Sequence, residues 1–226
     1  MQVITLMAQK GGTGKTTAAI NFAGAALIAG RKPLIIDVDM QASACKWADR
    51  RGVESSPHVI DAQPSRLIAA LEKAAGMGFD FILIDTPAKS GEAGLAAARV
   101  SNLVVIPYRP QILDLETVES SRDLIRLANN VPAIALLNAV PPVGFRRRQE
   151  AADFLKQYDI SICPHVISQR AVFGDAMAAG QSVLEFEPDG KASQEILIAY
   201  NYLSQLVGKL ASRETADGTT KSRRAS

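Results

Sequence analysis

The stretch KGGTGKTT, residues 10–17, is the strongest indication of the fold in this sequence. It follows a short apolar run, residues 3–7, and it opens a segment with helical periodicity, residues 15–29. Three glycines leave backbone N–H groups uncovered, and a lysine and two threonines follow them, as in a phosphate-binding loop. The usual first glycine of such a loop is replaced by Gln9, and Lys10 stands beside it. The order of strand, loop and helix predicts an anion-binding turn rather than a chance glycine-rich turn.

Outward from this loop, short apolar runs alternate with helical patterns along the chain. The runs are rich in Ile, Leu and Val and show little alternation, as in a parallel sheet that is buried on both faces. The expected strands cover residues 3–7, 34–38, 79–85, 102–108, 133–138 and about 160–165. The expected helices cover residues 15–29, 65–75, 92–100, 113–129, 147–158, 171–179 and 192–211. This order predicts an α/β fold with a doubly wound, mostly parallel sheet flanked by helices.

Length and composition favour a single domain. The chain has 226 residues, 47% of them hydrophobic, and no segment in its middle reads as a linker. We expect one domain over residues 1–211 and a disordered, polar and basic tail over residues 212–226, which lack apolar periodicity. No apolar stretch approaches the roughly 20 residues that span a bilayer, and no signal peptide is recognised.

Charge and cysteine content exclude several classes of protein. The net charge of +2 is too small to indicate nucleic-acid binding on its own. Cys45 and Cys163 belong to no CxxC pair, and the chain has only two histidines. We therefore expect free thiols rather than a zinc site or a disulfide framework.

The loop predicts a nucleotide site with a defined role for each residue. The nucleotide-binding residues expected here are Gly11, Gly12, Thr13, Gly14, Lys15, Thr16 and Thr17. The glycines turn backbone N–H groups toward the anion, and the N-terminus of the helix adds its positive end. Lys15 is expected to reach the β- and γ-phosphates, Thr16 to ligate Mg²⁺, and Thr17 to reach the α-phosphate.

Three aspartates, Asp37, Asp39 and Asp85, lie at the ends of two apolar runs. Because ligands of α/β sheets bind beyond the carboxyl ends of the strands, these side chains should face the phosphate loop. Carboxylates at such a place suit Mg²⁺ and its waters. We expect Asp85 to hold the metal through water and Asp37 to support the same shell. A helix cap or a solvated turn is the ordinary alternative for any one of them.

The loop also fits K-G-G-x-G-K-[ST]-[ST], the deviant Walker A motif, so the chain resembles the ParA/MinD family of P-loop ATPases. IIDVDMQAS (35–43) resembles the switch I segment of that family, and FDFILIDTPA (79–88) resembles its Walker B strand and switch II. Two later segments, VIPYRPQILDLETV (105–118) and VISQRAVFGDAMAAGQSVLEF (166–186), extend the resemblance to nearly everything before the tail. Met40 and Ala88 replace prolines that are usual in the two switch segments.

The resemblance implies an ATPase that uses ATP and Mg²⁺ in a homodimer. Two subunits would sandwich two ATP molecules, with Lys10 reaching the nucleotide of the partner subunit. Asp39 matches the residue that orients the attacking water, so the implied catalytic residues are Lys10, Lys15 and Asp39. Asn138 is expected to read the adenine edge, although an ordinary strand-end turn is an equal alternative. The loop at Pro164 is expected to flank the base.

Among branches of the family, the residues favour the short, ParF-like ParA type. The tail has no apolar face, so membrane attachment of the MinD kind is not expected. The short ParA type binds DNA without sequence specificity when it holds ATP, and salt should weaken such binding. The expected DNA contacts are Arg170, Lys191, Lys209 and Arg213, each of which is also compatible with a merely solvated charge. The resemblance places the protein in the cytoplasm, on the nucleoid.

Several functions remain compatible with these residues. The first is plasmid or chromosome segregation by a weak ATPase that DNA and a ParB- or ParG-like centromere-binding partner stimulate. The alternatives are positioning of a protein cargo and a VirC-type helper of DNA transfer. A metabolic ATP-dependent ligase of the same fold, resembling dethiobiotin synthetase, would generally lack a lysine of the Lys10 kind.

Overall fold

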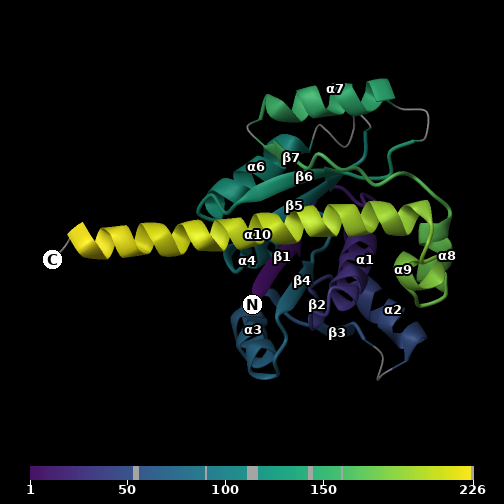
Figure 1. Ribbon diagram of the computed structural model, residues 1–226, viewed down its shortest axis with the longest axis horizontal. Coiled ribbons are helices and arrows are strands. Elements are labelled where there is room, and N and C mark those ends of the chain that lie inside the picture. Colours follow the sequence, from purple (N-terminus) through teal and green to yellow (C-terminus); the bar gives the residue numbers. More distant parts are fainter. Residues whose placement is uncertain (53–55, 90, 111–116, 142–144, 159, 225–226) are drawn as a thin grey trace.

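Seven strands form one sheet in the order β3-β2-β4-β1-β5-β6-β7, and every pair of neighbours is parallel (Figure 1). The computed structural model describes residues 1–224 apart from 53–55, 90, 111–116, 142–144 and 159, and it leaves the side chains of 145–148 and 213–224 undescribed. The strands are β1 Gln2–Leu6, β2 Pro33–Asp37, β3 His58–Asp61, β4 Phe81–Asp85, β5 Leu103–Tyr108, β6 Ala133–Leu137 and β7 Ser161–Ile162. The doubly wound α/β fold expected from the sequence is confirmed.

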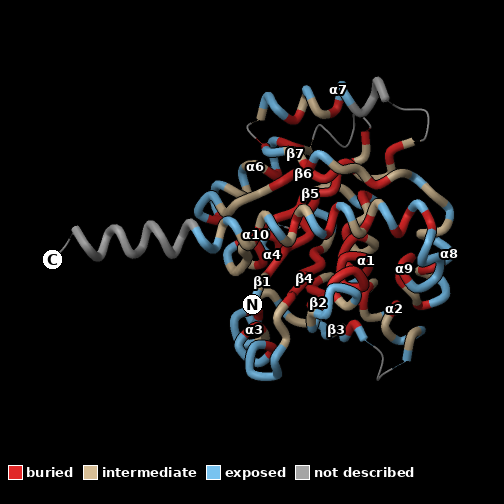
Figure 2. Tube along the Cα trace, viewed as in Figure 1, coloured by how far each residue is buried: buried red, intermediate tan, exposed pale blue. Residues whose placement is uncertain are grey.

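Helices cover both faces of this sheet. One face carries α1 Lys15–Ile28, α2 Ser43–Arg51, α8 Val172–Ala178, α9 Val183–Phe186 and α10 Lys191–Arg224. The other carries α3 Leu67–Gly76 with the preceding 3₁₀ turn Pro64–Arg66, α4 Gly91–Arg99, α6 Val118–Leu127 and α7 Phe145–Lys156. Because successive strand residues point to opposite faces, Leu83 joins the first core whereas Ile82 and Ile84 join another. Figure 2 shows the buried residues gathered on the strands and on the helix surfaces that face them.

The strand register brings three chain segments to one edge of the sheet. Leu6, the last residue of β1, lies opposite Asp85 of β4, and Asp85 also lies opposite Asp37 of β2. The loop after β1 and the two aspartates therefore emerge together at the carboxyl ends of neighbouring strands. This is where an α/β sheet presents a ligand site.

Besides the four-residue helix α9, two elements, α2 and β3, were not expected from the sequence. In α2 only Ala44 and Trp47 are buried, so the helix shows no continuous apolar stripe. The strand β3 lies at the edge of the sheet, and none of its residues is fully buried. Both elements carry too few apolar residues for their periodicity to be recognised.

The C-terminal helix also differs from the sequence prediction. The sequence predicts no regular structure after residue 211, whereas α10 continues to Arg224. Once a helix has nucleated, each further residue adds a hydrogen bond without another nucleation cost, so the turns before residue 211 favour continuation. The division into a domain at 1–211 and a separate tail stays a prediction. None of the described helices combines the length and the apolar composition needed to cross a membrane.

Candidate functional site

The loop at residues 10–17 leads directly into α1, whose N-cap is Gly14. Gly14 has φ 91°, a left-handed conformation that favours glycine. A Cβ at this position would lie 2.2 Å from Nδ2 of Asn138, so a side chain is also excluded by space. The first N–H groups of a helix have no intrahelical partner, and here no cap side chain occupies them. The loop therefore presents free backbone donors to an anion.

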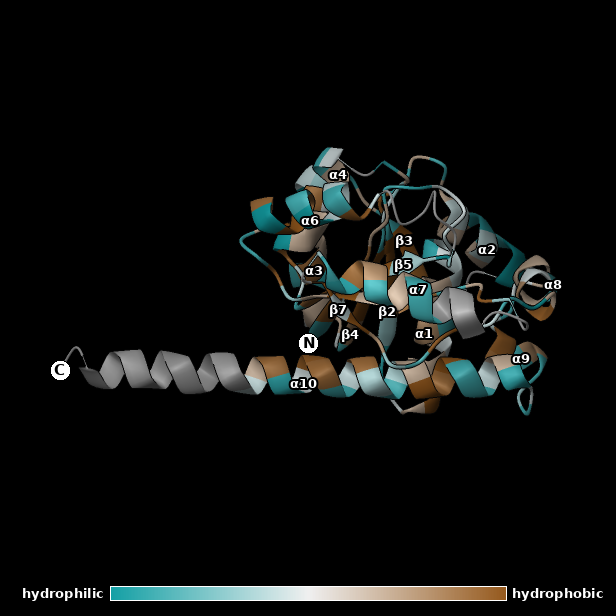
Figure 3. Cartoon of the chain, turned by 90° about the horizontal axis from the view of Figure 1, so that it is seen from above, coloured by the Kyte–Doolittle hydropathy of each residue, from teal (hydrophilic) through white to brown (hydrophobic). Residues whose placement is uncertain are grey.

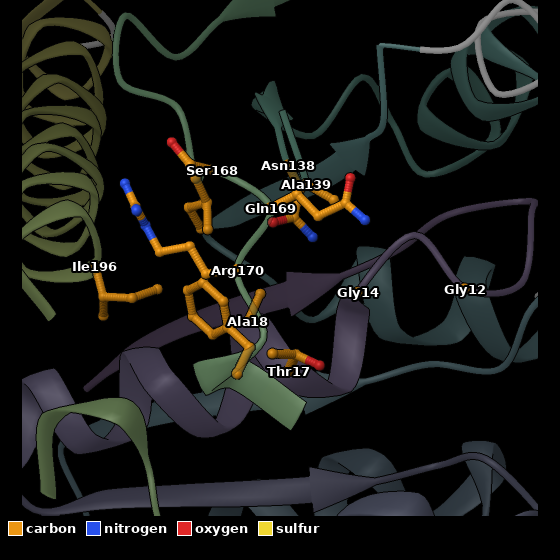
Figure 4. A pocket seen from close by; sticks show the side chains of 12 residues that line it. Gly12, Gly14, Thr17, Ala18, Asn138, Ala139, Ser168, Gln169, Arg170 and Ile196 are labelled. Atoms are coloured by element: carbon orange, nitrogen blue, oxygen red, sulfur yellow. The ribbon is translucent and has the colours of Figure 1, made fainter. Parts of the chain in front are cut away.

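Two cavities meet at this loop. One, of about 360 Å³, is bordered by polar side chains that include Lys15, Asp39 and Gln41. The other, of about 160 Å³, has a more apolar wall that includes Phe173 and Ile196 (Figure 4). Gly12, Gly14 and Thr17 line both cavities. The arrangement suits a ligand with a polyanionic part and a flat, less polar part, joined beside the loop.

Lys15 supplies the positive charge of the larger cavity. Its side chain is buried, with 8% of the residue exposed. Burial lowers the pKa of its ammonium group, and the carboxylates of Asp85 and Asp39 oppose that shift. A cation held in this way gains most when a polyanion enters the cavity, because burial has already removed much of its hydration.

Thr16 and Asp85 form the corner that fits a metal ion. The Thr16 hydroxyl donates a 2.6 Å hydrogen bond to Oδ2 of Asp85. The other oxygen, Oδ1, is buried and has no hydrogen-bond partner among the described residues. Burial raises the pKa of Asp85 to about 7, and the hydrogen bond from Thr16 opposes this rise. An unpartnered carboxylate oxygen beside a hydroxyl fits Mg²⁺ and its waters.

The metal corner is sparse in protein ligands. Within the part of the chain that the structure describes, no group of three or more His, Cys, Asp or Glu side chains is placed to hold a metal ion. Mg²⁺ usually keeps several waters and is held by one or two carboxylates together with substrate phosphates. A sparse corner of this kind is therefore compatible with Mg²⁺ that arrives with a nucleotide.

Asp37 does not have the environment that the sequence predicts for a metal-supporting carboxylate. It is 1% exposed, and both of its oxygens accept backbone N–H groups of the segment that follows. Burial raises its pKa, and the hydrogen bonds from Asp39, Cys45 and Ala44 oppose the rise. Its position at the strand end agrees with expectation, but Oδ2 accepts two N–H groups of α2, which the sequence did not predict, and Oδ1 accepts one from the loop before it.

Asp39 lines the larger cavity, as expected from the switch I resemblance. Its Oδ1 accepts the N–H of Gln41 at 2.9 Å, which leaves the second oxygen for a ligand or water. Pro87 and Ala88 border the same cavity from the segment after β4. Met40, one of the two departures from the family pattern, is fully exposed.

Asn138 lines the smaller cavity, and its amide also supports the phosphate loop. Its Nδ2 donates a 2.7 Å hydrogen bond to the carbonyl oxygen of Thr13. The expected role in reading a base stays a prediction, now with an additional structural role beside it.

Pro164 is exposed and does not border either cavity. The chain runs past it and returns to the sheet at Ile167, whose N–H donates to the Leu137 carbonyl. An isolated parallel bridge then joins Val140 to Ser168. The wall expected from the Pro164 loop is therefore built by residues 167–170, because this later segment extends the sheet edge beside Asn138.

Several site residues were not found from the sequence. Ser43 at the start of α2 lines the larger cavity, and Phe173 of α8 lines the smaller one. Arg109 follows β5, and its Nη1 would lie 3.9 Å from a Cβ added at Gly12, which places the guanidinium beside the loop. All three residues lie in segments that resemble the family, 35–43, 105–118 and 166–186, and this resemblance is the signal that the sequence offers. The positions of Ser43 and Phe173 depend on long-range packing.

Lys10 lies within the loop and is half-buried. It is not among the described residues that border the two cavities. Its expected action on the nucleotide of a partner subunit stays a prediction.

The four expected DNA contacts have different environments. Arg170 is only partly exposed, and its Nη2 bonds Oε1 of Glu195 at 2.7 Å; in Figure 4 its side chain extends toward α10. Lys191 and Lys209 are exposed on α10. Arg213 belongs to α10 as well, but its side chain lies outside the described ones. Arg170 is thus already engaged in holding the cavity wall, whereas the two lysines face solvent.

Both cysteines are free thiols, as expected. Burial raises the pKa of Cys45 and of Cys163 to about 11, so neither thiol is activated as a nucleophile.

A comparison with known protein families shows the family to which this fold and loop belong. A family model described as VirC1 protein matches residues 1–207. The chain belongs to the VirC1 family of ParA/MinD-type P-loop ATPases. Membership in this VirC1 family places the chain among the ParA-like partitioning and positioning ATPases.

The similarity of the chain to individual proteins agrees with this family assignment. The chain is 29% identical to maintenance of carboxysome distribution protein A of Gloeobacter kilaueensis over 205 residues, which cover 90% of this chain and 93% of that protein. It is 32% identical to protein virC1 of Rhizobium rhizogenes over 153 residues, which cover 64% of this chain and 66% of that one. The solved structure of the MinD cell division protein of Aquifex aeolicus has the same fold, with a TM-score of 0.73 at 18% identity over 91% of this chain and 97% of that one.

Proposed function

We propose that the protein binds Mg²⁺-ATP at the phosphate loop, dimerises around the nucleotide, binds DNA without sequence specificity, and leaves DNA when ATP is hydrolysed. One observation carries the nucleotide part of this proposal. A polar cavity with Lys15 and the Thr16–Asp85 corner joins a more apolar cavity beside Asn138, and the loop borders both. A triphosphate and a nucleoside are the two parts of ATP that these cavities fit.

Each residue of the site has a separate role in phosphoryl transfer. The backbone donors after Gly14 and the ammonium group of Lys15 bind and neutralise the phosphates. Thr16 and Asp85 would hold Mg²⁺, which would supply positive charge to neutralise the charge that develops on the phosphates. Asp39, which lines the larger cavity, orients the attacking water. Such transfer depends on positioning and charge more than on covalent chemistry, so these few groups are sufficient.

Dimerisation explains the lysine at position 10. We assign Lys10 to the nucleotide of the partner subunit, where it acts as an arginine finger does when it is supplied in trans. ATP turnover is then slow in isolated subunits and rises when DNA and a partner protein favour the complete dimer.

The surface of α10 supports DNA binding. Among the described side chains of α10, those of residues 191–212, one exposed stripe carries no acidic residue and consists of Lys191, Gln194, Ile198, Asn201, Gln205 and Lys209. Lys191 and Lys209 are 18 residues apart, which is five helical turns or about 27 Å on the same side. Figure 3 shows α10 along one side of the molecule, with hydrophobic and hydrophilic positions alternating along it. Two separated cations on one rigid helix suit contacts with phosphates and carry no sequence information.

We expect the cargo that this ATPase positions to be a DNA molecule. Plasmid or chromosome segregation with a ParB- or ParG-like centromere-binding partner, on the nucleoid in the cytoplasm, is the first candidate. A VirC-type role in DNA transfer is the second, and the match of the VirC1 family model to residues 1–207 favours it. A relative named for carboxysome distribution supports protein cargo as a further possibility.

Retention of DNA tests this proposal. Purified protein is incubated with an arbitrary duplex in ATP, ADP or no nucleotide, and bound DNA is measured from low to moderate salt. We expect retention in ATP alone, lost by about tenfold or more as salt rises, because counterion release dominates such binding. Equal retention in ATP and ADP contradicts the proposal.

Matched charge variants locate the DNA contact. Lys191→Ala with Lys209→Ala removes the α10 cations, whereas Lys73→Ala with Lys156→Ala removes two exposed lysines from the helices of the opposite face. Only the first pair should weaken retention and reduce its salt dependence. Equal effects of the two pairs would show that α10 is not the contact surface.

A further inference from the structure

Asp37 is buried at the end of β2, directly before the loop that borders the larger cavity. Its Oδ1 accepts the N–H of Asp39 at 3.0 Å, and its Oδ2 accepts the N–H groups of Ala44 at 2.9 Å and Cys45 at 3.3 Å. The carboxylate thus closes the loop of residues 38–43 on itself. That loop contains Asp39, Gln41 and Ser43, which all line the cavity.

The start of α2 explains why a distant carboxylate is needed. The N-cap is Ala42, in a left-handed conformation with φ 51°, and alanine has no side-chain acceptor. A cap residue normally accepts from the second or third residue of the helix, which here are Ala44 and Cys45. Asp37 bonds these same two N–H groups from seven and eight residues upstream. It therefore replaces the missing local cap and ties α2 to the strand.

Asp37 and Asp85 lie opposite each other on β2 and β4, yet they differ in what they offer a cation. Asp85 has one buried oxygen without a hydrogen-bond partner among the described residues. Both oxygens of Asp37 are engaged with backbone donors. Of the two, only Asp85 therefore presents to the metal shell an oxygen that accepts no hydrogen bond from the described residues.

We propose that Asp37 is a positioning residue, which fixes Asp39 and the start of α2 against the phosphate cavity, and that it does not bind Mg²⁺. The proposal concerns ATP turnover, so in that respect it rests on the proposed function. Its structural part, the capping of α2, does not. Loss of Asp37 should displace the water-orienting carboxylate and leave metal binding intact.

The test compares Asp37→Asn with Asp85→Asn. The first leaves only one acceptor oxygen at nearly unchanged size, so the side chain can accept from Asp39 or from Ala44 and Cys45 but no longer from both sides. Binding of a fluorescent ADP analogue is measured with Mg²⁺ and with a chelator. We expect Mg²⁺ to strengthen binding to Asp37→Asn as in the wild type, within about twofold, and to lose its effect in Asp85→Asn. Loss of the Mg²⁺ effect in both variants would overturn the proposal.

Two further readouts separate positioning from general damage. Hydrogen exchange of a peptide spanning residues 38–47 should accelerate in Asp37→Asn, whereas a peptide from α3 should exchange as in the wild type. The kcat for ATP should fall about tenfold or more, with KM changed less than about threefold. Unchanged exchange at residues 38–47 or an unchanged kcat would contradict the assignment.

A second-site variant keeps the test valid if Asp37→Asn is unstable. Asparagine tolerates the left-handed conformation and can accept from the second and third helical residues, so Ala42→Asn supplies a local cap. In the Asp37→Asn background it should restore slow exchange at α2, and failure of this rescue counts against the capping role. If the wild-type protein did not hydrolyse ATP, the proposed function would be contradicted. The hydrogen-exchange and Mg²⁺-binding measurements would still test the role of Asp37.

Discussion

At the scale of single residues, Gly14 and Asn138 join the two halves of the site. The Asn138 amide donates to the Thr13 carbonyl, and no room remains between it and Gly14 for a side chain. The phosphate loop is therefore braced by a residue that also borders the smaller cavity, named the nucleoside cavity below after the ligand part that we propose for it. The sequence predicted both residues at the site, but not this bond, because a contact over 125 residues follows only from the order of the strands.

We expect Gly14→Ala to weaken nucleotide binding by about tenfold or more, because the new Cβ displaces the Asn138 amide and strains the loop. Gly30 is the matched control, since it has φ 74° but nothing within 4 Å of an added Cβ. Gly30→Ala should cost about 1 kcal/mol of unfolding free energy and leave nucleotide affinity unchanged. Titration of a fluorescent nucleotide and urea unfolding measure the two quantities. Equal affinity in both variants would contradict the account.

At the scale of elements, α2 connects the switch loop to α8 and α9. Trp47 is fully buried, and its indole N–H donates to the Gln181 carbonyl at 3.3 Å. Arg51 pairs with Glu185, which also accepts from Ser182 in a capping box at the start of α9. The start of α2 thus borders the larger cavity, and its other end contacts the segment that leads from the nucleoside cavity to α10.

Elements with a local sequence signal were predicted, whereas α2, which depends on distant contacts, was not. Strand β1, the loop and α1 were predicted because their signal is local: apolar residues, glycines and a helical pattern follow one another. The helix α2 was missed because its stability comes from Trp47, Arg51 and the distant cap Asp37 rather than from an apolar stripe. A helix cap was one of the alternatives for Asp37, but the sequence did not favour it because α2, whose N–H groups Asp37 accepts, was not predicted.

The Arg51–Glu185 pair predicts an acid-sensitive contribution to stability. Burial opposes ionisation, but the hydrogen bonds from Arg51 and Ser182 hold the pKa of Glu185 below its usual value. A carboxyl with a lowered pKa stabilises the folded state above its unfolded pKa, about 4.3, and this contribution is lost as pH falls below that value. Glu185→Gln should therefore be less stable than the wild type at pH 7, by about 1 kcal/mol since solvent partly screens the pair.

Urea unfolding at pH 7 and between pH 3 and 5 measures this difference, which should shrink toward the acid end. Glu72→Gln, on the exposed side of α3, is the control and should show no such change. The same pH dependence in both variants would refute the assignment to the α2–α9 contact.

At the scale of the whole molecule, the nucleotide edge of the sheet and α10 belong to one unit. Glu195 of α10 accepts from the N–H and hydroxyl of Ser168 and from Arg170, so the wall of the nucleoside cavity is bonded to the helix that carries the exposed lysines. A nucleotide that moves this wall would act directly on α10. This link gives the proposed coupling between ATP and DNA a physical route.

We propose that two ATP-loaded subunits meet through Lys10, and the mass of the protein in solution tests this most directly. Wild type, Lys10→Ala, Asp39→Ala and the control Lys32→Ala, an exposed lysine, are compared in ATP and in ADP by analytical ultracentrifugation. We predict that Asp39→Ala accumulates as a dimer in ATP, that Lys10→Ala binds ATP but stays monomeric, and that Lys32→Ala behaves as wild type. A Lys10→Ala protein that dimerises in ATP as readily as Asp39→Ala would contradict the account.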